Sequence, residues 1–246
     1  MKPSFRRNLL LAILALCAGL FLYQRLQKPN NPFPSGETLV NDFAELYYSS
    51  GVHYRTKWLG IPTLENPCDM WAIQEIIAET RPDFIIETGT FKGGGAVFYA
   101  SILRYVNPTA KVITVDIKPQ FEDAAKLELF RERVEFIEGS SVAEDVVNRI
   151  AARIKGGRAM VTLDSDHRMA HVLNELRLYS KFVSVGSYLI VQDTAHNGHP
   201  LKTTYGKGPM EALEEFLKEN KDFVRDQGRE KFLLTFHPRG YLKRVR

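Results

Sequence analysis

The sequence contains little cysteine and no strong excess of charge of either sign. Its two cysteines are Cys17 and Cys68, so a disulfide-stabilised scaffold is not expected and the body of the chain fits a reducing compartment. Lys and Arg number 33 against 29 Asp and Glu, which gives a net charge of +4, and the basic residues are scattered among the acidic ones. We therefore expect no nucleic-acid partner, and we interpret the basic end RGYLKRVR as a solvated tail.

Long hydrophobic runs are also scarce, and the clearest one lies near the N-terminus. It extends from Leu9 to Tyr23 behind three basic residues, and it is shorter than the ~20 residues that a transmembrane helix needs. No cleavage site of small residues follows, which favours an uncleaved anchor over a secretory signal. We expect a single hydrophobic membrane anchor at residues 1–27, a linker rich in Pro and Asn at 28–37, and one folded domain at 38–246.

Short runs rich in Ile, Val and Phe alternate with amphipathic patterns through the folded domain. The runs predict strands at residues 83–87, 111–116, 134–138, 159–163 and 188–192. The amphipathic patterns predict helices at residues 39–50, 68–80, 94–105, 121–130, 143–155, 168–180 and 209–220. Near the end, DFVRD and KFLLTFHPRGYLKRV predict two more strands. The expected fold is Rossmann-like α/β, with a mostly parallel seven-stranded sheet, helices on both faces and an antiparallel C-terminal hairpin.

A glycine-rich turn follows the first predicted strand of this sheet. Its sequence, ETGTFKGGG, is neither the GxGxxG that holds a pyrophosphate nor a P-loop, because no GK[ST] follows. It starts instead with the acidic Glu87, which suits a cationic amino or sulfonium group. Asp116 ends the next strand, where a carboxylate can accept both hydroxyls of a ribose. Together these features predict an S-adenosylmethionine site formed by Glu87, Gly89, Thr90, Gly93, Asp116, Gly139 and Ser140.

Acidic and amide side chains follow the fourth and fifth predicted strands. Asp164 comes from LDSDH, and Gln192 and Asp193 come from IVQDT, so both sets should emerge at the edge of the sheet that carries the glycine turn. Their oxygens suit Mg²⁺ or a similar hard cation, and we expect all three to bind it. His167 is the first choice for a catalytic base, and His196 is the second. In the alternative, the aspartates only cap a helix or shape a turn.

Two other functions are compatible with the same residues. Asp164, His167 and His171 are spaced to share a helical face and can form the facial triad of a non-haem iron hydroxylase. Such triads usually lie in β-barrels, so we rank this alternative below methyl transfer. The second alternative is a non-catalytic, membrane-tethered binding domain.

Several motifs in one order resemble the cephalosporin hydroxylase and rhamnosyl O-methyltransferase family. They include WLGIPTLENPCDMW, IIETGTFKGGGAVFYA, VTLDSDHRMAHVLNELRLYSKF, GKGPMEALEEFL and EKFLLTFHPRGYLKR, and the resemblance covers about residues 54–245. It implies a class I methyltransferase fold and O-methylation that uses S-adenosylmethionine and a divalent metal. The implied acceptor is a small-molecule hydroxyl on a sugar, glycolipid or natural product.

Carried over residue by residue, the metal-binding acids of the family fall on Asp164 and on the pair Gln192 and Asp193. Gln192 stands where the family usually has glutamate, so either it holds the metal more weakly or it is turned away. Glu65 stands where a basic residue is common. Because S-adenosylmethionine is expected in the cytosol, methyl transfer requires the catalytic domain behind the predicted membrane anchor to face the cytoplasm, and a homo-oligomer is compatible with this expectation.

Overall fold

The computed structural model describes residues 36–246, and the chain divides into two units, residues 1–39 and 40–246. Of the first unit, only residues 36–39 are described, and they begin helix α2 (Gly36–Ser49). This helix starts inside the linker predicted at residues 28–37. The predicted anchor at residues 1–27 lies outside the described residues.

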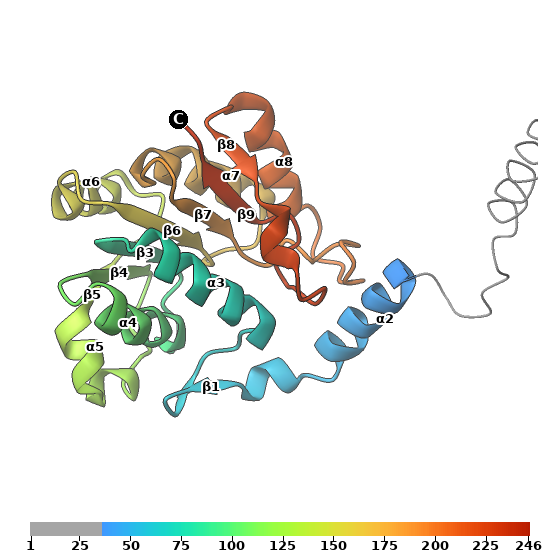
Figure 1. The fold of residues 1–246 in the computed structure, drawn as a ribbon, viewed down its shortest axis with the longest axis horizontal. Helices are drawn as coiled ribbons and strands as arrows, with labels where there is room; N and C mark the ends of the chain where they lie inside the picture. Colours follow the sequence, from blue (N-terminus) through green and yellow to red (C-terminus); the bar gives the residue numbers. More distant parts are fainter. Residues whose placement is uncertain (1–35) are drawn as a thin grey trace, which may run out of the picture. The chain divides into compact units, whose positions relative to one another are not determined.

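The second unit contains a seven-stranded sheet with strand order β5-β4-β3-β6-β7-β9-β8 (Figure 1). All pairs from β5 to β7 are parallel, and β9 is antiparallel to both of its neighbours. The strands are β3 (Phe84–Thr88), β4 (Lys111–Asp116), β5 (Val134–Glu138), β6 (Ala159–Leu163), β7 (Tyr188–Val191), β8 (Phe223–Arg225) and β9 (Tyr241–Arg244). The predicted fold class is confirmed, including the antiparallel pairing of the last two strands.

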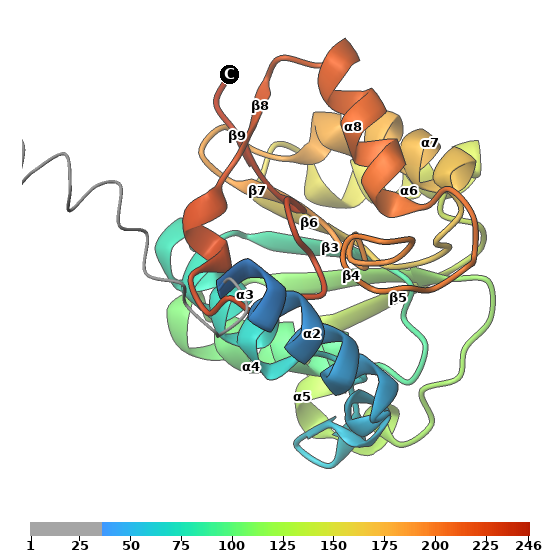
Figure 2. The ribbon, with the colours of Figure 1, turned by 90° about the vertical axis from the view of Figure 1, so that its right-hand side faces the viewer.

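Helices cover both faces of the sheet, and each layer buries its own hydrophobic cluster (Figure 2). Alternating residues of β3 show the division, because Ile85 faces one cluster and Ile86 faces the other. One layer contains α3 (Pro67–Thr80), α4 (Gly94–Val106) and α5 (Glu128–Arg133), and the other contains α6 (Glu144–Ile154), α7 (Met169–Tyr179) and α8 (Pro209–Glu219). A small hairpin of β1 (Lys57–Trp58) and β2 (Ile61–Pro62) precedes α3.

Four short 3₁₀ helices complete the described elements of residues 36–246. They are η1 (Val52–Arg55), η2 (Ala124–Lys126), η3 (Ser180–Phe182) and η4 (Gln227–Glu230). The helix predicted at residues 121–130 is wrong, because η2 and α5 replace it and Leu127 between them is extended. The break lets Phe121 and Phe130 turn toward each other, with ring centroids 5.1 Å apart, so local packing overrides the helical pattern.

Local signals fix the ends of the helices that approach the sheet edge. The Asn66 side chain accepts the amide N–H of Cys68, and Pro67 occupies the first turn of α3, where its missing N–H costs nothing. Gly93, the residue just before α4, has φ 80°, a conformation that glycine adopts without steric cost. These two helix starts place residues 65–66 and 87–95 beside the carboxyl ends of the strands.

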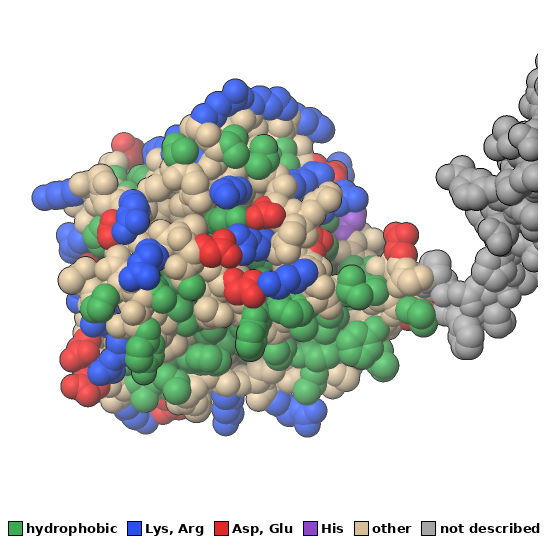
Figure 3. Space-filling model, in the orientation of Figure 1, with side chains coloured by type: hydrophobic (Ala, Val, Ile, Leu, Met, Phe, Trp, Pro, Cys, Tyr) green, Lys and Arg blue, Asp and Glu red, His purple; other side chains and the backbone are tan. Residues whose placement is uncertain are grey.

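The face of the molecule drawn in Figure 3 carries both charge signs and a broad hydrophobic area. Figure 3 shows Lys, Arg, Asp and Glu interspersed over the upper part of one face, while hydrophobic side chains gather over the lower part, where α2 and α3 lie. Phe43, Leu46 and Trp71 of these helices are exposed. The predicted homo-oligomer stays a prediction.

The predicted membrane localisation requires correction. In the part of the chain that the structure describes, we find no helix with the length and apolar character needed to cross a bilayer. The assignment of a membrane-anchored protein with a cytoplasm-facing domain is therefore withdrawn.

The turn after β3 generates the first testable prediction. Gly89 has φ 88°, and a Cβ atom there would lie 2.0 Å from the carbonyl oxygen of Asp164, whereas Gly186 has φ 84° and open space around it. Gly186→Ala should therefore lower the free energy of unfolding by about 1–2 kcal/mol, the cost of the left-handed backbone alone. Gly89→Ala should lower it by about 3 kcal/mol or more, because the clash with the β6 turn adds to that cost. Urea unfolding of both variants measures the difference, and equal losses would contradict close contact between the β3 and β6 turns.

Candidate active site

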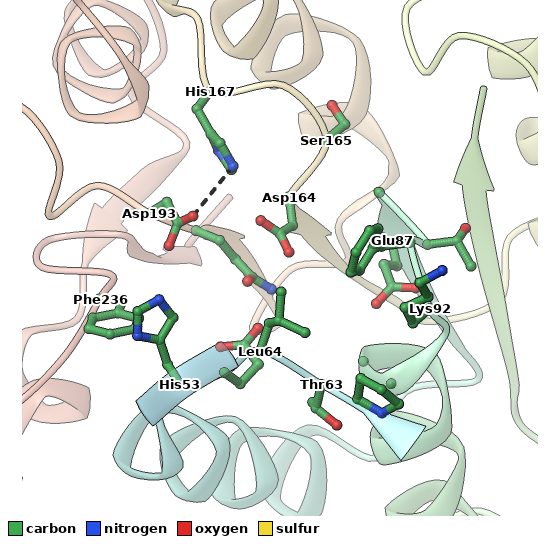
Figure 4. Close-up of a pocket in the computed structure, with 18 of the residues that line it drawn as sticks. His53, Thr63, Leu64, Glu87, Lys92, Asp164, Ser165, His167, Asp193 and Phe236 are labelled. Atoms are coloured by element: carbon green, nitrogen blue, oxygen red, sulfur yellow. Dashed lines mark ion pairs between the residues drawn. The ribbon is translucent and has the colours of Figure 1, made fainter. Parts of the chain in front are cut away.

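A cleft of about 520 Å³ lies where the parallel strands end (Figure 4). Its lining comes from the ends of β3, β4, β6 and β7, from the segment before α3, and from residues near α2 and β9. Because parallel strands place their carboxyl ends at one edge, the acids that follow them converge there. The predicted site residues that line the cleft are Glu87, Gly89, Thr90, Asp116, Asp164, His167, Gln192, Asp193 and His196.

Glu87 lies at the end of β3 beneath the glycine turn. A Cβ on Gly95 would be 2.3 Å from Glu87 Oε1, so glycine is required there for the carboxylate to fit. The Thr114 hydroxyl donates to Glu87 Oε2. Burial raises the pKa of Glu87 to about 8, and the negative charges of Glu65 and Asp116 act in the same direction. A cationic group in the cleft would relieve this penalty.

Asp116 lies at the end of β4, and backbone amides hold its carboxylate. Oδ2 accepts the amide N–H of Phe91 at 2.9 Å, and Oδ1 accepts that of Ile117 at 2.7 Å. Each oxygen keeps a second lone pair that can accept a hydroxyl hydrogen bond. Thr90 is buried, and its hydroxyl oxygen lies 2.7 Å from that of Thr114. It therefore supports the turn from below.

The other three residues predicted for the cofactor do not line the cleft. Gly93 lies just before α4, and Ser140 accepts the amide N–H of Ala143 through its carbonyl. Gly139 donates its amide N–H to the carbonyl of Asp116 at 2.8 Å, so it fixes the end of β4. The structure brings these residues to the same edge of the sheet, but as parts of the turns around the cleft.

Asp164, His167 and Asp193 form a cluster that suits one metal ion. One ligand atom from each lies within 4.8 Å of the others, and within residues 36–246 no other group of three or more acidic, histidine or cysteine side chains has this geometry. Figure 4 shows His167 directed toward Asp193, with Nε2 3.4 Å from Oδ2. Two carboxylates at this spacing are suitable donors for a hard divalent cation.

The two carboxylates of this cluster have opposite electrostatic surroundings. Burial raises the pKa of Asp164 well above its usual range, and the charges of Asp193 and Glu65 raise it further. Burial also raises the pKa of Asp193, but His196, whose Nε2 lies 3.7 Å from Asp193 Oδ2, and the nearby charge of His167 outweigh it and lower that pKa to about 2. The charge of His237 does not offset the burial of Asp164, and a bound cation would supply the missing compensation.

Gln192 lies beside the cluster with its oxygen turned away. We assign its amide from the hydrogen bonds, with the oxygen accepting the hydroxyl of Thr162 at 2.8 Å. In this orientation the nitrogen donates to Glu65 Oε1 at 2.7 Å and to Asp164 Oδ2 at 3.3 Å. The amide oxygen, the atom that could bind a metal, is therefore turned away from the cluster, while the amide nitrogen contacts Asp164.

His171 does not join Asp164 and His167. Its Nε2 lies 3.0 Å from the hydroxyl of Ser141, 3.2 Å from that of Ser165 and 3.5 Å from Glu175 Oε1. The hydrogen bond to Glu175 raises the pKa of His171, in spite of burial. The facial triad that an iron hydroxylase would need is therefore not assembled from these three residues.

The structure adds several residues that sequence reasoning left without a role in the site. Glu65 is buried and reaches Gln192, and His237 is buried and accepts the amide N–H of Asp193 through Nδ1 at 3.0 Å. Nothing in the spacing of the sequence places Glu65 or His237 near Asp193, because Glu65 comes from a segment without periodicity and His237 comes from a run that predicted a strand.

Aromatic rings and histidines form the wall of the cleft on the α2 side. Tyr48 stacks on His53 with ring centroids 4.9 Å apart, and His53 lies 4.1 Å from Tyr54 by the same measure. Phe236 contacts Tyr48 edge to face at 5.8 Å, and Tyr205 contacts His196 at 5.6 Å. These rings give the cleft a largely apolar wall beside the cluster of Asp164, His167 and Asp193.

Comparisons with known proteins agree with this geometry. The family described as Rhamnosyl O-methyltransferase/CmcI matches residues 50–245. A rhamnosyl O-methyltransferase of Mycobacterium leprae (strain TN) is 36% identical over 213 residues, which cover 85% of this chain and 91% of the relative. Another, from Mycobacterium tuberculosis (strain H37Rv), is 38% identical over 214 residues, which cover 85% of this chain and 86% of the relative.

Among solved structures, one described as CmcI-D160 with Mg and SAM has a TM-score of 0.59 to this chain at 17% identity, and the match covers 78% of each chain. At this identity the match shows a similar fold. The chain therefore belongs to the rhamnosyl O-methyltransferase/CmcI family, and the predictions of this family and of an S-adenosylmethionine-dependent O-methyltransferase are confirmed.

Proposed function

We propose that this cleft transfers a methyl group from S-adenosylmethionine to a hydroxyl of a sugar acceptor, with help from a divalent cation. The observation that carries the proposal is the meeting of two chemically different halves in one cleft. Glu87 and Asp116 line one half, and Asp164, His167 and Asp193 line the other.

The first half suits the cofactor. Glu87 would face the cationic methionine end, because its buried carboxyl has a raised pKa that a positive charge would lower. Asp116 would accept the ribose hydroxyls with the lone pairs that the amides of Phe91 and Ile117 leave available. When bound, the cofactor supplies an activated methyl group. Gly89, Gly94 and Gly95 let the backbone approach it without Cβ atoms.

The second half suits the metal and the acceptor hydroxyl. Asp164 and Asp193 would hold Mg²⁺ or a similar ion, which when bound supplies Lewis acidity that lowers the pKa of a hydroxyl. His167 is exposed at the cleft and lies beside Asp193, so it can accept the hydroxyl proton. Magnesium prefers oxygen ligands, which favours the base role for His167 over ligation.

The aromatic wall supports a sugar as the acceptor. Pockets for small molecules combine apolar and aromatic walls with a few polar groups that fix orientation. Tyr48, Tyr54 and Phe236 can cover the carbon skeleton of a sugar ring while its hydroxyls face the acidic cluster. The relatives from Mycobacterium are named for a rhamnosyl acceptor, and we extend that acceptor class to this chain.

Acceptor class is tested with a simple rhamnoside and a catechol as alternative substrates. We expect S-adenosylhomocysteine to form when S-adenosylmethionine, Mg²⁺ and an alkyl rhamnoside are present together, and not when the acceptor is omitted. Mass spectrometry should find one added methyl group on the sugar. Methylation of the catechol without methylation of the rhamnoside would contradict a sugar acceptor.

Cofactor affinity should depend on pH through Glu87. Its pKa is about 8 in the free protein, so at pH 6 the carboxyl is protonated and must lose its proton to pair with the cationic cofactor. Affinity should rise by up to about tenfold per pH unit between pH 6 and 8 and level off above pH 8. Calorimetry across this pH range measures the affinity for S-adenosylmethionine. In Glu87→Gln, the pH dependence of affinity that comes from Glu87 should be lost, and only the titration of the cofactor's own amino group should remain. The same pH profile of affinity in the wild type and the variant would contradict the role of Glu87.

Variants of the second half separate metal ligation from proton transfer. Asp164→Asn should abolish the dependence of turnover on Mg²⁺ and change S-adenosylmethionine affinity by less than about threefold, because Glu87 and Asp116 are retained. His167→Asn should lower kcat by about 10² to 10⁴ without weakening Mn²⁺ binding, as loss of a general base does. His171→Asn is the matched control and should keep full activity. A large loss of Mn²⁺ affinity in His167→Asn would assign His167 as a ligand instead.

A further inference from the structure

Glu65 connects the two sides of the acidic cluster through two different neighbours. It lies between the β1–β2 hairpin and α3, and only 9% of its surface is exposed. Resting on the proposed function, we propose that Glu65 is a positioning residue that holds Asp164 and Asp193 at the separation one divalent cation requires, acting through Gln192 and His237.

The first connection runs through the amide of Gln192. Its nitrogen has two hydrogens, and it donates to Glu65 Oε1 at 2.7 Å and to Asp164 Oδ2 at 3.3 Å. The amide oxygen is fixed by the Thr162 hydroxyl, so the side chain cannot turn without losing a buried hydrogen bond. Gln192 therefore sets the distance between two carboxylates that would repel each other in direct contact.

The second connection runs through His237. Its Nδ1 accepts the amide N–H of Asp193 at 3.0 Å, so in this contact Nδ1 is unprotonated and the ring proton lies on Nε2. Nε2 is buried without a hydrogen-bond partner within 3.5 Å, and its nearest acceptors are Glu65 Oε2 at 3.6 Å and Asp69 Oδ2 at 4.0 Å. Glu65 thus faces the imidazole on the side opposite to Asp193.

Asp193 needs this support because its backbone is strained. Its φ is 56°, a left-handed conformation that costs a non-glycine residue on the order of 1–3 kcal/mol. The hydrogen bond to His237 holds the amide in that conformation, and the conformation directs the carboxylate toward Asp164 and His167. Strain maintained at a ligand position is typical of a preorganised site.

The segment that carries His237 is itself fixed by α3. Asp69 accepts the amide N–H of Phe236 and the hydroxyl of Tyr241, each at 2.7 Å, and the hydroxyl of Thr235. Glu65 and Asp69 therefore come from one end of α3, and both face the Nε2 side of the same imidazole. The arrangement links α3, β6 and the segment after β7 into one closed set of contacts around the cluster.

Binding of Mn²⁺ alone, followed by electron paramagnetic resonance without cofactor or acceptor, tests this proposal. Glu65→Gln should weaken Mn²⁺ binding by about 10- to 100-fold, as loss of an outer-shell partner does. S-adenosylmethionine affinity should change by less than about threefold. Glu75→Gln is the matched control, because Glu75 pairs with Lys231 at the surface, and it should bind Mn²⁺ like the wild type.

Variants of His237 show whether the effect reaches Asp193. His237→Asn can still accept the Asp193 amide N–H through its side-chain oxygen but no longer faces Glu65, so its Mn²⁺ affinity should fall between those of the wild type and His237→Leu.

If Glu65→Gln does not fold, Glu65→Asp is measured in its place. Its side chain is too short to reach both neighbours, so the same loss of Mn²⁺ affinity is expected.

The outcomes separate this proposal from the proposed function. A wild-type protein that binds no Mn²⁺ would contradict the metal site itself. Wild-type protein that binds Mn²⁺, together with a folded Glu65 variant of equal affinity, would overturn the positioning role and leave the proposed function intact.

Discussion

The repulsion among carboxylates at one sheet edge is the constraint on which the site depends. Glu65, Glu87, Asp164 and Asp193 all line one cleft, and burying a charge without a partner is costly. Neighbouring groups compensate them in three ways: the Thr114 hydroxyl bonds Glu87, the Gln192 amide bonds both Glu65 and Asp164, and histidines lie beside Asp193. What these neighbours leave uncompensated, above all at Asp164, is the charge that a cationic cofactor and a metal ion can balance.

The sequence predicted the elements whose pattern is set by burial on both faces. Strands β4, β5 and β6 have the predicted bounds, because a parallel strand between two helical layers shows as a short apolar run between polar ends. The convergence of Asp116, Asp164 and Asp193 was predictable for the same reason, since topology alone places them at one edge. The glycine turn was also predictable, although Gly93, Gly139 and Ser140 turned out to shape the turns and not to line the cleft.

The parts that the sequence did not predict depend on contacts between distant segments. The helix at residues 121–130 is broken because Phe121 and Phe130 meet across Leu127, a tertiary preference that no periodicity shows. The strand expected to begin at Lys231 begins at Tyr241 instead, because residues 235–236 turn to bond Asp69 of α3. The same turn places His237 beside Asp193, so one long-range set of hydrogen bonds explains both the shorter strand and the unpredicted site residue.

Two departures from the family pattern that are far apart in sequence are neighbours in space. The resemblance implies a glutamate at position 192 and a basic residue at position 65, whereas this chain has Gln192 and Glu65, and their side chains are in contact at 2.7 Å. A glutamate at 192 beside Glu65 would place two carboxylates in contact, which requires a shared proton or a cation between them. With an amide at 192, the carboxylate of Glu65 has a donor, and the pair keeps one negative charge next to Asp164. In this chain the carboxylate therefore lies at position 65, between the Gln192 amide and the His237 imidazole, and the amide lies at position 192.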